Sequence, residues 1–268
     1  MIRSIQVECS LKCLRMAGKV NLNNVSIVLH RPRYPENIGA AARAMRNMGI
    51  EQLIVVDAQN CDLTKICRMA THAALDVVEH MQVYDSLEEA LPEFHYVVGT
   101  TARLGGQRKV ISTPSRLAAR LLPISALNQI AIVFGPEDRG LTNLEIRHCH
   151  ALVHIPTAEF SSLNLAQAVM VVCYELFCYR DDGKDAKPAP RLANRQALDE
   201  MYAQLKDVLM RISFINPDNP DYFMNNFRQF FSRLPLRAKE VSIIRGLCRQ
   251  IDWYGEKCRR DGHSSGKD

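Results

Sequence analysis

Short apolar runs that alternate with helical patterns limit the possible folds of this chain more than any other feature. Five runs have the length and the β-branched character of buried strands, at residues 25–29, 53–56, 96–100, 130–134 and 152–155. Helical patterns lie between or after them, at residues 37–48, 63–75, 86–91, 115–122 and 163–179. Strands that alternate with helices indicate an α/β fold, in which helices cover both faces of a parallel sheet.

A hydrophilic segment divides the chain into two parts. Residues 181–190 contain Asp-Asp-Gly, Lys-Asp and Pro-Ala-Pro, which is the composition of a linker. We expect the α/β domain at residues 25–180 and a small all-α domain at residues 191–258. Residues 1–24 would be an extension that could be disordered, and residues 259–268 a flexible tail. Helical patterns in the second domain lie at residues 192–212, 222–232 and 238–254.

The formal net charge of +5 is unevenly distributed along the chain. Residues 25–180 hold 14 Lys and Arg against 15 Asp and Glu, whereas residues 191–268 hold 14 against 10 and the first 24 residues 4 against 1. A near-neutral centre between basic ends suits a protein that holds a polyanion such as RNA from its sides. Many basic proteins bind no nucleic acid, so the charge alone leaves both interpretations open.

The cysteines and the apolar segments bear on location. Nine cysteines are scattered without a C-x-x-C pair, which is typical of reduced thiols in a cytoplasmic protein. The spacings of His148-Cys149-His150 and of Cys61 with Cys67 fit no usual zinc site, so we expect no metal. The longest apolar run, at 165–179, is too short to span a bilayer, and we expect no membrane partner.

Three clusters of small and polar residues lie where a predicted strand gives way to a loop or a helix. They are Asn37-Ile38-Gly39 with Arg43, Gly135-Pro136-Glu137 with Gly140, and residues 161–166. Asn37 is the expected N-cap of the first helix, and Gly49 its stop. Open α/β sheets bind ligands at such junctions, so the three clusters predict one composite site.

Each cluster also has a simpler interpretation. The glycine loops could be ordinary turns, and Arg43 and Arg103 could be solvated surface arginines. Ser161 to Asn164 could do no more than cap a helix. The chain has no G-x-G-x-x-G after its first strand and no P-loop sequence, so dinucleotide and P-loop nucleotide binding lack their usual sequence support.

Taken together, the clusters resemble the three motifs of the SPOUT RNA 2′-O-ribose methyltransferases. The motifs are Asn37-Ile38-Gly39-Ala40-Ala41-Ala42-Arg43-Ala44-Met45, Phe134 to Asn143, and Ser161-Ser162-Leu163-Asn164-Leu165-Ala166, in the family's order. Phe214 to Pro220 and Ile244 to Leu247 resemble the helical extension of the TrmJ branch of this family, the tRNA cytidine/uridine-32 2′-O-methyltransferases. The resemblance runs from about residue 25 to residue 254.

The resemblance implies a fold, a cofactor and a reaction. The end of the α/β domain would thread a deep trefoil knot, and the chain would act as a homodimer with its sites near the subunit interface. S-adenosylmethionine would donate a methyl group to the ribose 2′-hydroxyl of nucleotide 32 in the anticodon loop of tRNA, without a metal. The alternatives are a ribosomal RNA 2′-O-methyltransferase and a non-catalytic knotted module that binds RNA.

The resemblance also predicts the site residues. The expected catalytic group is Asn37, Arg43, Arg103, Ser162 and Asn164. The expected cofactor-binding residues are Thr100, Thr101, Ala102, Gly135, Glu137, Gly140, Ile155, Ser162 and Leu163. For the substrate RNA we expect contacts from Arg31, Arg33, Arg43, Arg103, Arg108 and Lys109. Arg43 either orients a phosphate or takes the hydroxyl proton with the help of that phosphate.

Some features depart from the family pattern or allow two interpretations. Pro136 stands where relatives often carry arginine, and Phe160 where tyrosine is common. Pro136 lacks a charge and a backbone donor, which puts its loop's contribution to substrate binding in doubt. The aromatic residues at 222–231 are expected to form the core of the helical domain rather than a platform for bases. Arg228, Arg233, Arg237 and Lys239 could contact tRNA phosphates.

Overall fold

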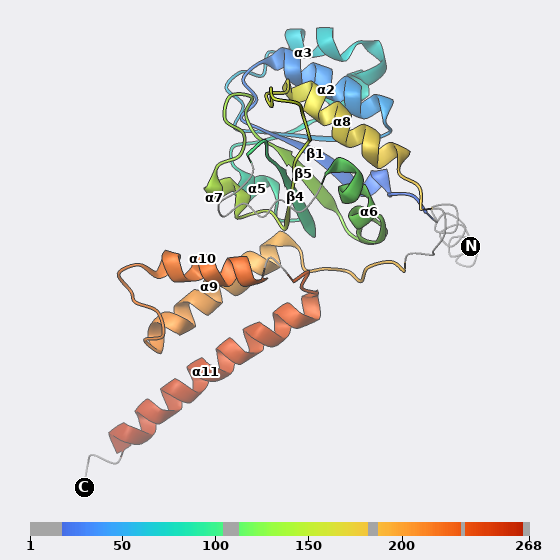
Figure 1. The fold of residues 1–268 in the computed structure, drawn as a ribbon. Coiled ribbons are helices and arrows are strands. Elements are labelled where there is room, and N and C mark those ends of the chain that lie inside the picture. The colour runs from blue at the N-terminus through green and yellow to red at the C-terminus, as the bar shows by residue number, and fades with distance from the viewer. Residues whose placement is uncertain (1–17, 104–112, 182–186, 232–233, 265–268) are drawn as a thin grey trace. The chain divides into compact units, whose positions relative to one another are not determined.

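The computed structural model describes residues 18–103, 113–181, 187–231 and 234–264 (Figure 1). The chain divides into two compact units, residues 1–191 and residues 192–268.

The first unit is built on a parallel sheet. Its strand order is β3-β2-β1-β5-β4-β6. The strands are β1 (Val25–His30), β2 (Gln52–Val56), β3 (Gln82–Tyr84), β4 (Tyr96–Thr100), β5 (Ile130–Phe134) and β6 (Ala151–Val153). All pairs are parallel, which confirms the predicted fold class and the first four predicted strands. The fifth prediction was displaced, because β6 ends at Val153 rather than at residue 155.

The helices of this unit differ more from the prediction. They are α2 (Pro35–Asn47), α3 (Leu63–Ala70), α4 (Leu75–Glu79), α5 (Leu87–Ala90), α6 (Pro114–Ser125), α7 (Asn143–Ile146) and α8 (Leu165–Cys178), with 3₁₀ turns η1 (Leu22–Asn24) and η2 (His72–Ala74). The single helix predicted at 63–75 was wrong. It is interrupted at Thr71, whose φ of 60° lies in the left-handed region that stops a right-handed helix.

Helices cover both faces of the sheet. On one face α5 and α7 pack against alternate strand residues, which form a cluster with Leu91, Phe94 and Leu141. On the other face α2, α3 and α8 lie together (Figure 1). Gly39 makes this layer possible, because a Cβ there would collide with the carbonyl oxygen of Ile66 on α3. β1 and β5 are buried along their whole length, as expected of strands covered on both sides.

Two segments outside the predicted limits of the α/β domain pack onto this unit. Val20 is buried, and the N–H of Asn21 donates to Ser125 Oγ at 2.9 Å. Within the segment predicted as a linker, the N–H of Ala189 donates to the carbonyl of Pro123 at 2.8 Å. Residues 18–24 and 187–191, which lie outside the expected limits of 25 and 180, therefore bind the same end of α6. Residues 1–17 lie outside the described part.

The described part of the second unit contains three helices. They are α9 (Arg195–Arg211), α10 (Pro220–Phe231) and α11 (Ala238–Ser264). α11 continues ten residues beyond the predicted end at Tyr254, so residues 259–264 of the expected flexible tail are helical. The core contains Leu198, Met201, Tyr202, Ile215 and Met224.

The aromatic residues of α10 divide between core and surface. Phe227 and Phe231 pack against the core of the unit, as expected. Tyr222 and Phe230 are 61% and 57% exposed, so the expectation that all of these rings form the core was wrong for them. A 12-residue helix that packs on one side leaves its other face in solvent.

Candidate functional site

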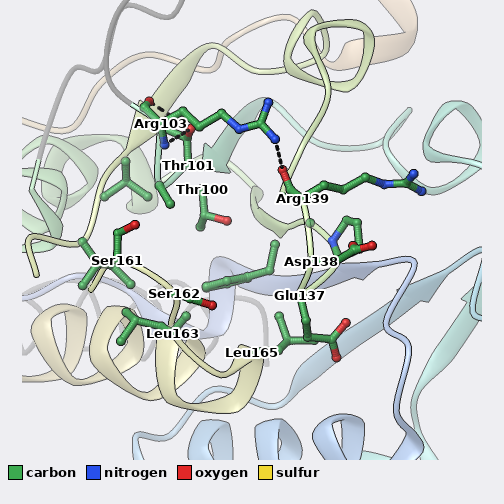
Figure 2. A pocket seen from close by; sticks show the side chains of 18 residues that line it. Thr100, Thr101, Arg103, Glu137, Asp138, Arg139, Ser161, Ser162, Leu163 and Leu165 are labelled. Carbon is green, nitrogen blue, oxygen red and sulfur yellow. Dashed lines mark hydrogen bonds between the residues drawn. The ribbon is translucent and has the colours of Figure 1, made fainter. Parts of the chain in front are cut away.

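A pocket of about 290 Å³ lies at the carboxyl ends of β4, β5 and β6 (Figure 2). The register places these ends side by side, because Gly99 pairs with Val133 and Thr100 pairs with Val153. The pocket is lined by Thr100, Thr101, Ala102, Arg103, Phe134, Gly135, Pro136, Glu137, Asp138, Arg139, Gly140, Val153, Ile155, Ser161, Ser162, Leu163, Leu165 and Ala168. The second and third motif clusters and the loop after β4 therefore form one site.

The loop after β4 is fixed by its own hydrogen bonds. The N–H of Thr101 donates to the carbonyl of Val153 at 2.9 Å, and the Thr100 hydroxyl donates to the carbonyl of Val133 at 3.2 Å. The N–H of Arg103 donates to Thr101 Oγ1 at 3.1 Å. The Arg103 guanidinium donates to the carbonyl oxygen of Arg139 at 3.3 Å and so ties this loop to the one after β5 (Figure 2).

The loop after β5 needs two glycines for its backbone. A Cβ at Gly135 would collide with the N–H of Leu141 and with Gly140, because the loop folds back onto its first residue. Gly140 has a φ of 64°, and its N–H donates to the carbonyl of Pro136 at 2.8 Å. These glycines shape the wall of the pocket, whatever ligand it takes.

Asn37, Glu137 and Asn164, one residue from each motif, are joined in a chain of hydrogen bonds. Asn37 Nδ2 donates to Glu137 Oε1 at 2.7 Å, and Asn164 Nδ2 donates to Asn37 Oδ1 at 2.9 Å. Asn164 Oδ1 also caps α8 by accepting from the N–H groups of Ala166 and Gln167. The prediction that Asn37 caps the first helix was wrong. α2 begins at Pro35, and Asn37 lies in its first turn with its side chain free to reach Glu137.

The predicted RNA-contacting arginines have different surroundings. Arg31 Nε lies 2.6 Å from Asp57 Oδ2, and an Arg33 guanidinium nitrogen lies 3.2 Å from Asp138 Oδ2. Arg43 is exposed on α2, about two turns from its start, and does not line the pocket. We find no ion pair or hydrogen bond from its side chain to the part of the chain that the structure describes. Arg108 and Lys109 lie outside that part.

Placement thus differs among the predicted groups. All the residues predicted to bind the cofactor line the pocket, as do Arg103 and Ser162 of the predicted catalytic group. Asn37 and Asn164 join it through Glu137, and Arg43 stands apart. The lining residues outside the predicted site groups include Val153, Leu165 and Ala168. These three are ordinary apolar core residues in sequence, and only the folding of the segment after β6 brings them to the pocket.

A second polar cluster beside the pocket was also missed. His30 Nε2 lies 3.0 Å from Glu145 Oε1, and Glu145 Oε2 accepts the N–H of Thr142 at 2.6 Å. Burial lowers the pKa of His30 and outweighs the attraction of Glu145. Burial would raise the pKa of Glu145, but hydrogen bonds from Thr142 and His30 outweigh it and the net pKa is lowered. The Thr-x-x-Glu spacing is a capping-box signal visible in the sequence.

Two negative findings concern the described residues only. Within residues 18–103, 113–181, 187–231 and 234–264, no three His, Cys, Asp or Glu side chains are grouped so that they could hold a metal ion. Across the same ranges, no helix is both long and apolar enough to cross a membrane.

Both parts of the chain match known protein families. The sequence model of the SpoU rRNA methylase family matches residues 24–174, more than half of the chain. The model of the C-terminal domain of the tRNA methyltransferase TrmJ matches residues 196–263.

Relatives with assigned activities cover most of the chain. The tRNA (cytidine/uridine/adenosine-2′-O-)-methyltransferase TrmJ of Pseudomonas aeruginosa is 35% identical over 242 residues, which are 84% of this chain and 93% of that protein. The tRNA (cytidine/uridine-2′-O-)-methyltransferase TrmJ of Escherichia coli is 33% identical over 240 residues, covering 86% and 96%.

Solved structures agree with these matches. The crystal structure of TrmJ from Z. mobilis ZM4 has a TM-score of 0.73 and 29% identity, and the match covers 85% of this chain and 98% of that one. A methylase family protein from Neisseria gonorrhoeae has a TM-score of 0.60 and 33% identity, covering 68% and 94%.

Proposed function

This chain belongs to the SpoU rRNA methylase family, and we propose that it is an RNA methyltransferase that uses S-adenosylmethionine to methylate a ribose 2′-hydroxyl, at nucleotide 32 in the anticodon loop of tRNA. The observation that carries the proposal is the convergence of the second and third motifs on one pocket, with the first motif joined to it through Asn37. The match of residues 196–263 to the TrmJ C-terminal domain favours tRNA over ribosomal RNA.

The pocket suits the proposed methyl donor. Ile155, Leu163 and Leu165 offer apolar surface to a purine ring, and the glycine-containing loop after β5 offers backbone groups that a polar ligand can approach closely. Its location at the carboxyl ends of parallel strands is where α/β folds bind such ligands. When bound, S-adenosylmethionine supplies a methyl group that the sulfonium has already activated.

The task left to the protein is alignment and removal of the hydroxyl proton. Ser162 and Arg103 line the pocket and would place the ribose against the methyl donor. The Glu137–Asn37–Asn164 chain of hydrogen bonds joins the three motifs. Arg43 would hold the neighbouring phosphate in a bidentate contact, and the proton would leave to solvent or through that phosphate.

A homodimer would explain why Arg43 stands apart from the pocket of its own chain. The outer face of α8 exposes Tyr174 and Phe177, which are 52% and 44% accessible, and Phe160 before the helix is 80% accessible. Exposed apolar residues on one helix are typical of a surface that a second subunit covers. Pairing there would bring the exposed arginine of one chain toward the site of another, and we expect a dimer in light scattering.

The trefoil knot is part of this proposal. β6 lies at the edge of the sheet beyond β4, whereas α8, the next helix, packs against α2 above β1. The segment between them, residues 154–164, passes the pocket and the loops after β4 and β5. We propose that this segment threads through a loop of the preceding chain before α8 begins, as a trefoil knot requires.

The helical unit would provide further contact with tRNA. Arg237 and Lys239 are exposed at the start of α11, where phosphates could reach them. Arg228 is less available, because its guanidinium lies over the Tyr202 ring, 5.5 Å from the centroid. Arg233 lies outside the described residues. The free cysteines of the described part, such as Cys61 and Cys67, are consistent with a cytoplasmic location, where tRNA is modified.

The test is to incubate the protein with unmodified tRNA, ribosomal RNA and isotopically labelled S-adenosylmethionine, and to locate the label by nuclease digestion and mass spectrometry. We expect a labelled ribose at nucleotide 32 of tRNA. Label in ribosomal RNA would keep the chemistry and overturn the substrate. No label on either RNA would contradict the proposed activity and favour a non-catalytic RNA-binding module.

A further inference from the structure

The loop of residues 135–142 is held by a second carboxylate besides Glu137. Glu145 uses both of its oxygens: one accepts the N–H of Thr142 at 2.6 Å, and the other lies 3.0 Å from His30 Nε2. The two side chains are 13% and 5% exposed, so water competes little for these bonds. Glu145 thus ties the end of the loop to the end of β1, at the centre of the sheet.

The hydrogen bond to Glu145 determines the tautomer of His30. An ionised carboxylate only accepts hydrogen bonds, so Nε2 of the imidazole carries the hydrogen. Nδ1 is buried and has no hydrogen-bond partner among the described residues. A protonated ring would bury an unpaired N–H there, which is costly, and burial lowers the pKa of His30 accordingly. His30 is therefore a neutral donor aimed at Glu145 through one defined nitrogen.

The position of Thr142 controls the wall of the pocket. Leu141 is buried in the sheet cluster, and Gly140 before it lines the pocket in a left-handed conformation. On its other side the loop is held at Glu137, which accepts from Asn37 Nδ2 and from the N–H of Arg33 at 3.1 Å. A loop fixed at both ends presents its backbone groups in one arrangement, whereas release of Thr142 would free Gly140 to move.

We propose that His30 and Glu145 are positioning residues that hold the loop of residues 135–142 in the shape that binds the methyl donor. The inference rests on the proposed function, because it takes the pocket to be the S-adenosylmethionine site. Neither side chain lines the pocket, and both act through Thr142. Loss of the hydrogen bond between Glu145 and Thr142 should weaken binding of S-adenosylmethionine and leave binding of tRNA unchanged.

The test compares variants that keep the hydrogen bonds of Glu145 to His30 and Thr142 with variants that lose one or both of them. His30→Gln places an amide N–H near the position of Nε2, whereas the shorter side chain of His30→Asn cannot reach Glu145. Glu145→Gln has one acceptor oxygen for two donors, the N–H of Thr142 and the Nε2–H of His30, whereas Glu145→Ala has none. We expect about a tenfold rise in the Kd and KM for S-adenosylmethionine in His30→Asn and Glu145→Ala, a smaller rise in Glu145→Gln, and less than about threefold in His30→Gln. The KM for tRNA should not change.

Ser86→Ala is the matched control. Ser86 caps α5, a helix of four residues like α7, by accepting the N–H of Glu89 away from the pocket. This variant should lose thermal stability and bind the donor like the wild type. Weaker binding of S-adenosylmethionine to Ser86→Ala would overturn the proposal in favour of a general loss of stability. Equally weak binding to His30→Gln and His30→Asn would also overturn it, in favour of a change in side-chain shape.

Calorimetric titration of the wild-type protein with S-adenosylmethionine distinguishes a failure of the proposed function from a failure of the positioning role of His30 and Glu145. No binding to the wild type would contradict the proposed function itself. Binding to the wild type with equal binding to His30→Asn and Glu145→Ala would overturn only the positioning role. If Glu145→Ala does not fold, the two His30 variants decide the question.

Discussion

Two residues of the first motif lie in contrasting environments, one in the hydrogen-bonded interior of the site and the other on the exposed face of α2. Asn37 is bonded on both sides, to Glu137 and to Asn164. Arg43, from the same motif and the same helix, is exposed, and its side chain forms no hydrogen bond or ion pair that we find with the described residues. The difference indicates that Asn37 helps to build the site, whereas Arg43 of the same motif is available to a group outside this unit. Substitutions in the two regions should therefore fail in different ways.

The largest effect should come from the backbone of the site. In Gly135→Ala the new methyl group would collide with backbone atoms of Gly140 and Leu141, which cannot move aside like a side chain. We expect a loss of at least ~3 kcal/mol of stability, or no folded protein, in denaturant unfolding. Gly140→Ala is the control: nothing lies near its Cβ, so only the left-handed φ is strained, at roughly 1 kcal/mol. Equal losses would contradict the account of the loop.

Arg43→Ala should fail in the opposite way. Because the side chain is exposed and does not line the pocket, stability and the affinity for S-adenosylmethionine should remain as in the wild type. Turnover of tRNA should fall on the order of 100-fold, the usual cost of removing one charged donor from a site. Single-turnover methylation measures this, with Arg46→Ala, an exposed arginine on the same helix, as the control. Lost donor binding in Arg43→Ala would mean a structural role.

Asn164→Ala tests the bond between the motifs. It removes the cap of α8 and leaves Asn37 Oδ1 without its donor, so we expect a loss of ~1–2 kcal/mol. Asn194→Ala is a matched variant, because Asn194 caps α9 through the N–H of Ala197 and belongs to the other unit. The loss in Asn164→Ala should be the greater of the two, by differential scanning calorimetry. A smaller loss would mean that the bond to Asn37 contributes nothing.

The smallest effect is a dependence of stability on pH. Burial lowers the pKa of His30 in the folded protein below its ordinary value of 6.5, so the unfolded chain binds the proton first. The contribution of neutral His30 to the free energy of unfolding is fully present above about pH 6.5. It is lost as the pH falls from there through the pKa of His30 in the folded protein. His30→Gln cannot titrate, so its unfolding midpoint should fall less than that of the wild type between pH 7 and pH 5.5. Burial also lowers the pKa of His95, but this contribution is present in both proteins and cancels in the comparison. Parallel curves would exclude this role of His30.

Elements with a strong local signal were predictable. The fully buried β1 and β5 were visible as continuous apolar runs, and the residues that line the pocket were mostly found from their motifs. β3 was missed, because it has three residues and two of them are exposed. The break at Thr71 comes from a backbone conformation that no residue type announces. Local periodicity carries no information on such features.

Contacts across the chain were the harder part of the site. His30 and Glu145 are 115 residues apart, and only the capping box at Thr142 was readable. Asn37 was read as a helix cap because its side chain suits that role locally, but Glu137 lies 100 residues away and binds it instead. The register of the sheet determines which residues of β1 and β5 lie side by side, and so which of the following residues can meet. The register in turn depends on the whole fold.

The two ends of the first unit enter and leave it on the side away from the pocket. Gly18 accepts the N–H of Asp181, and residues 18–24 and 187–191 both bind around the end of α6. That end lies beside the start of β5, whereas the pocket lies beyond its last residue. Segments joined at either terminus can therefore be exchanged, lengthened or lost without touching the catalytic edge.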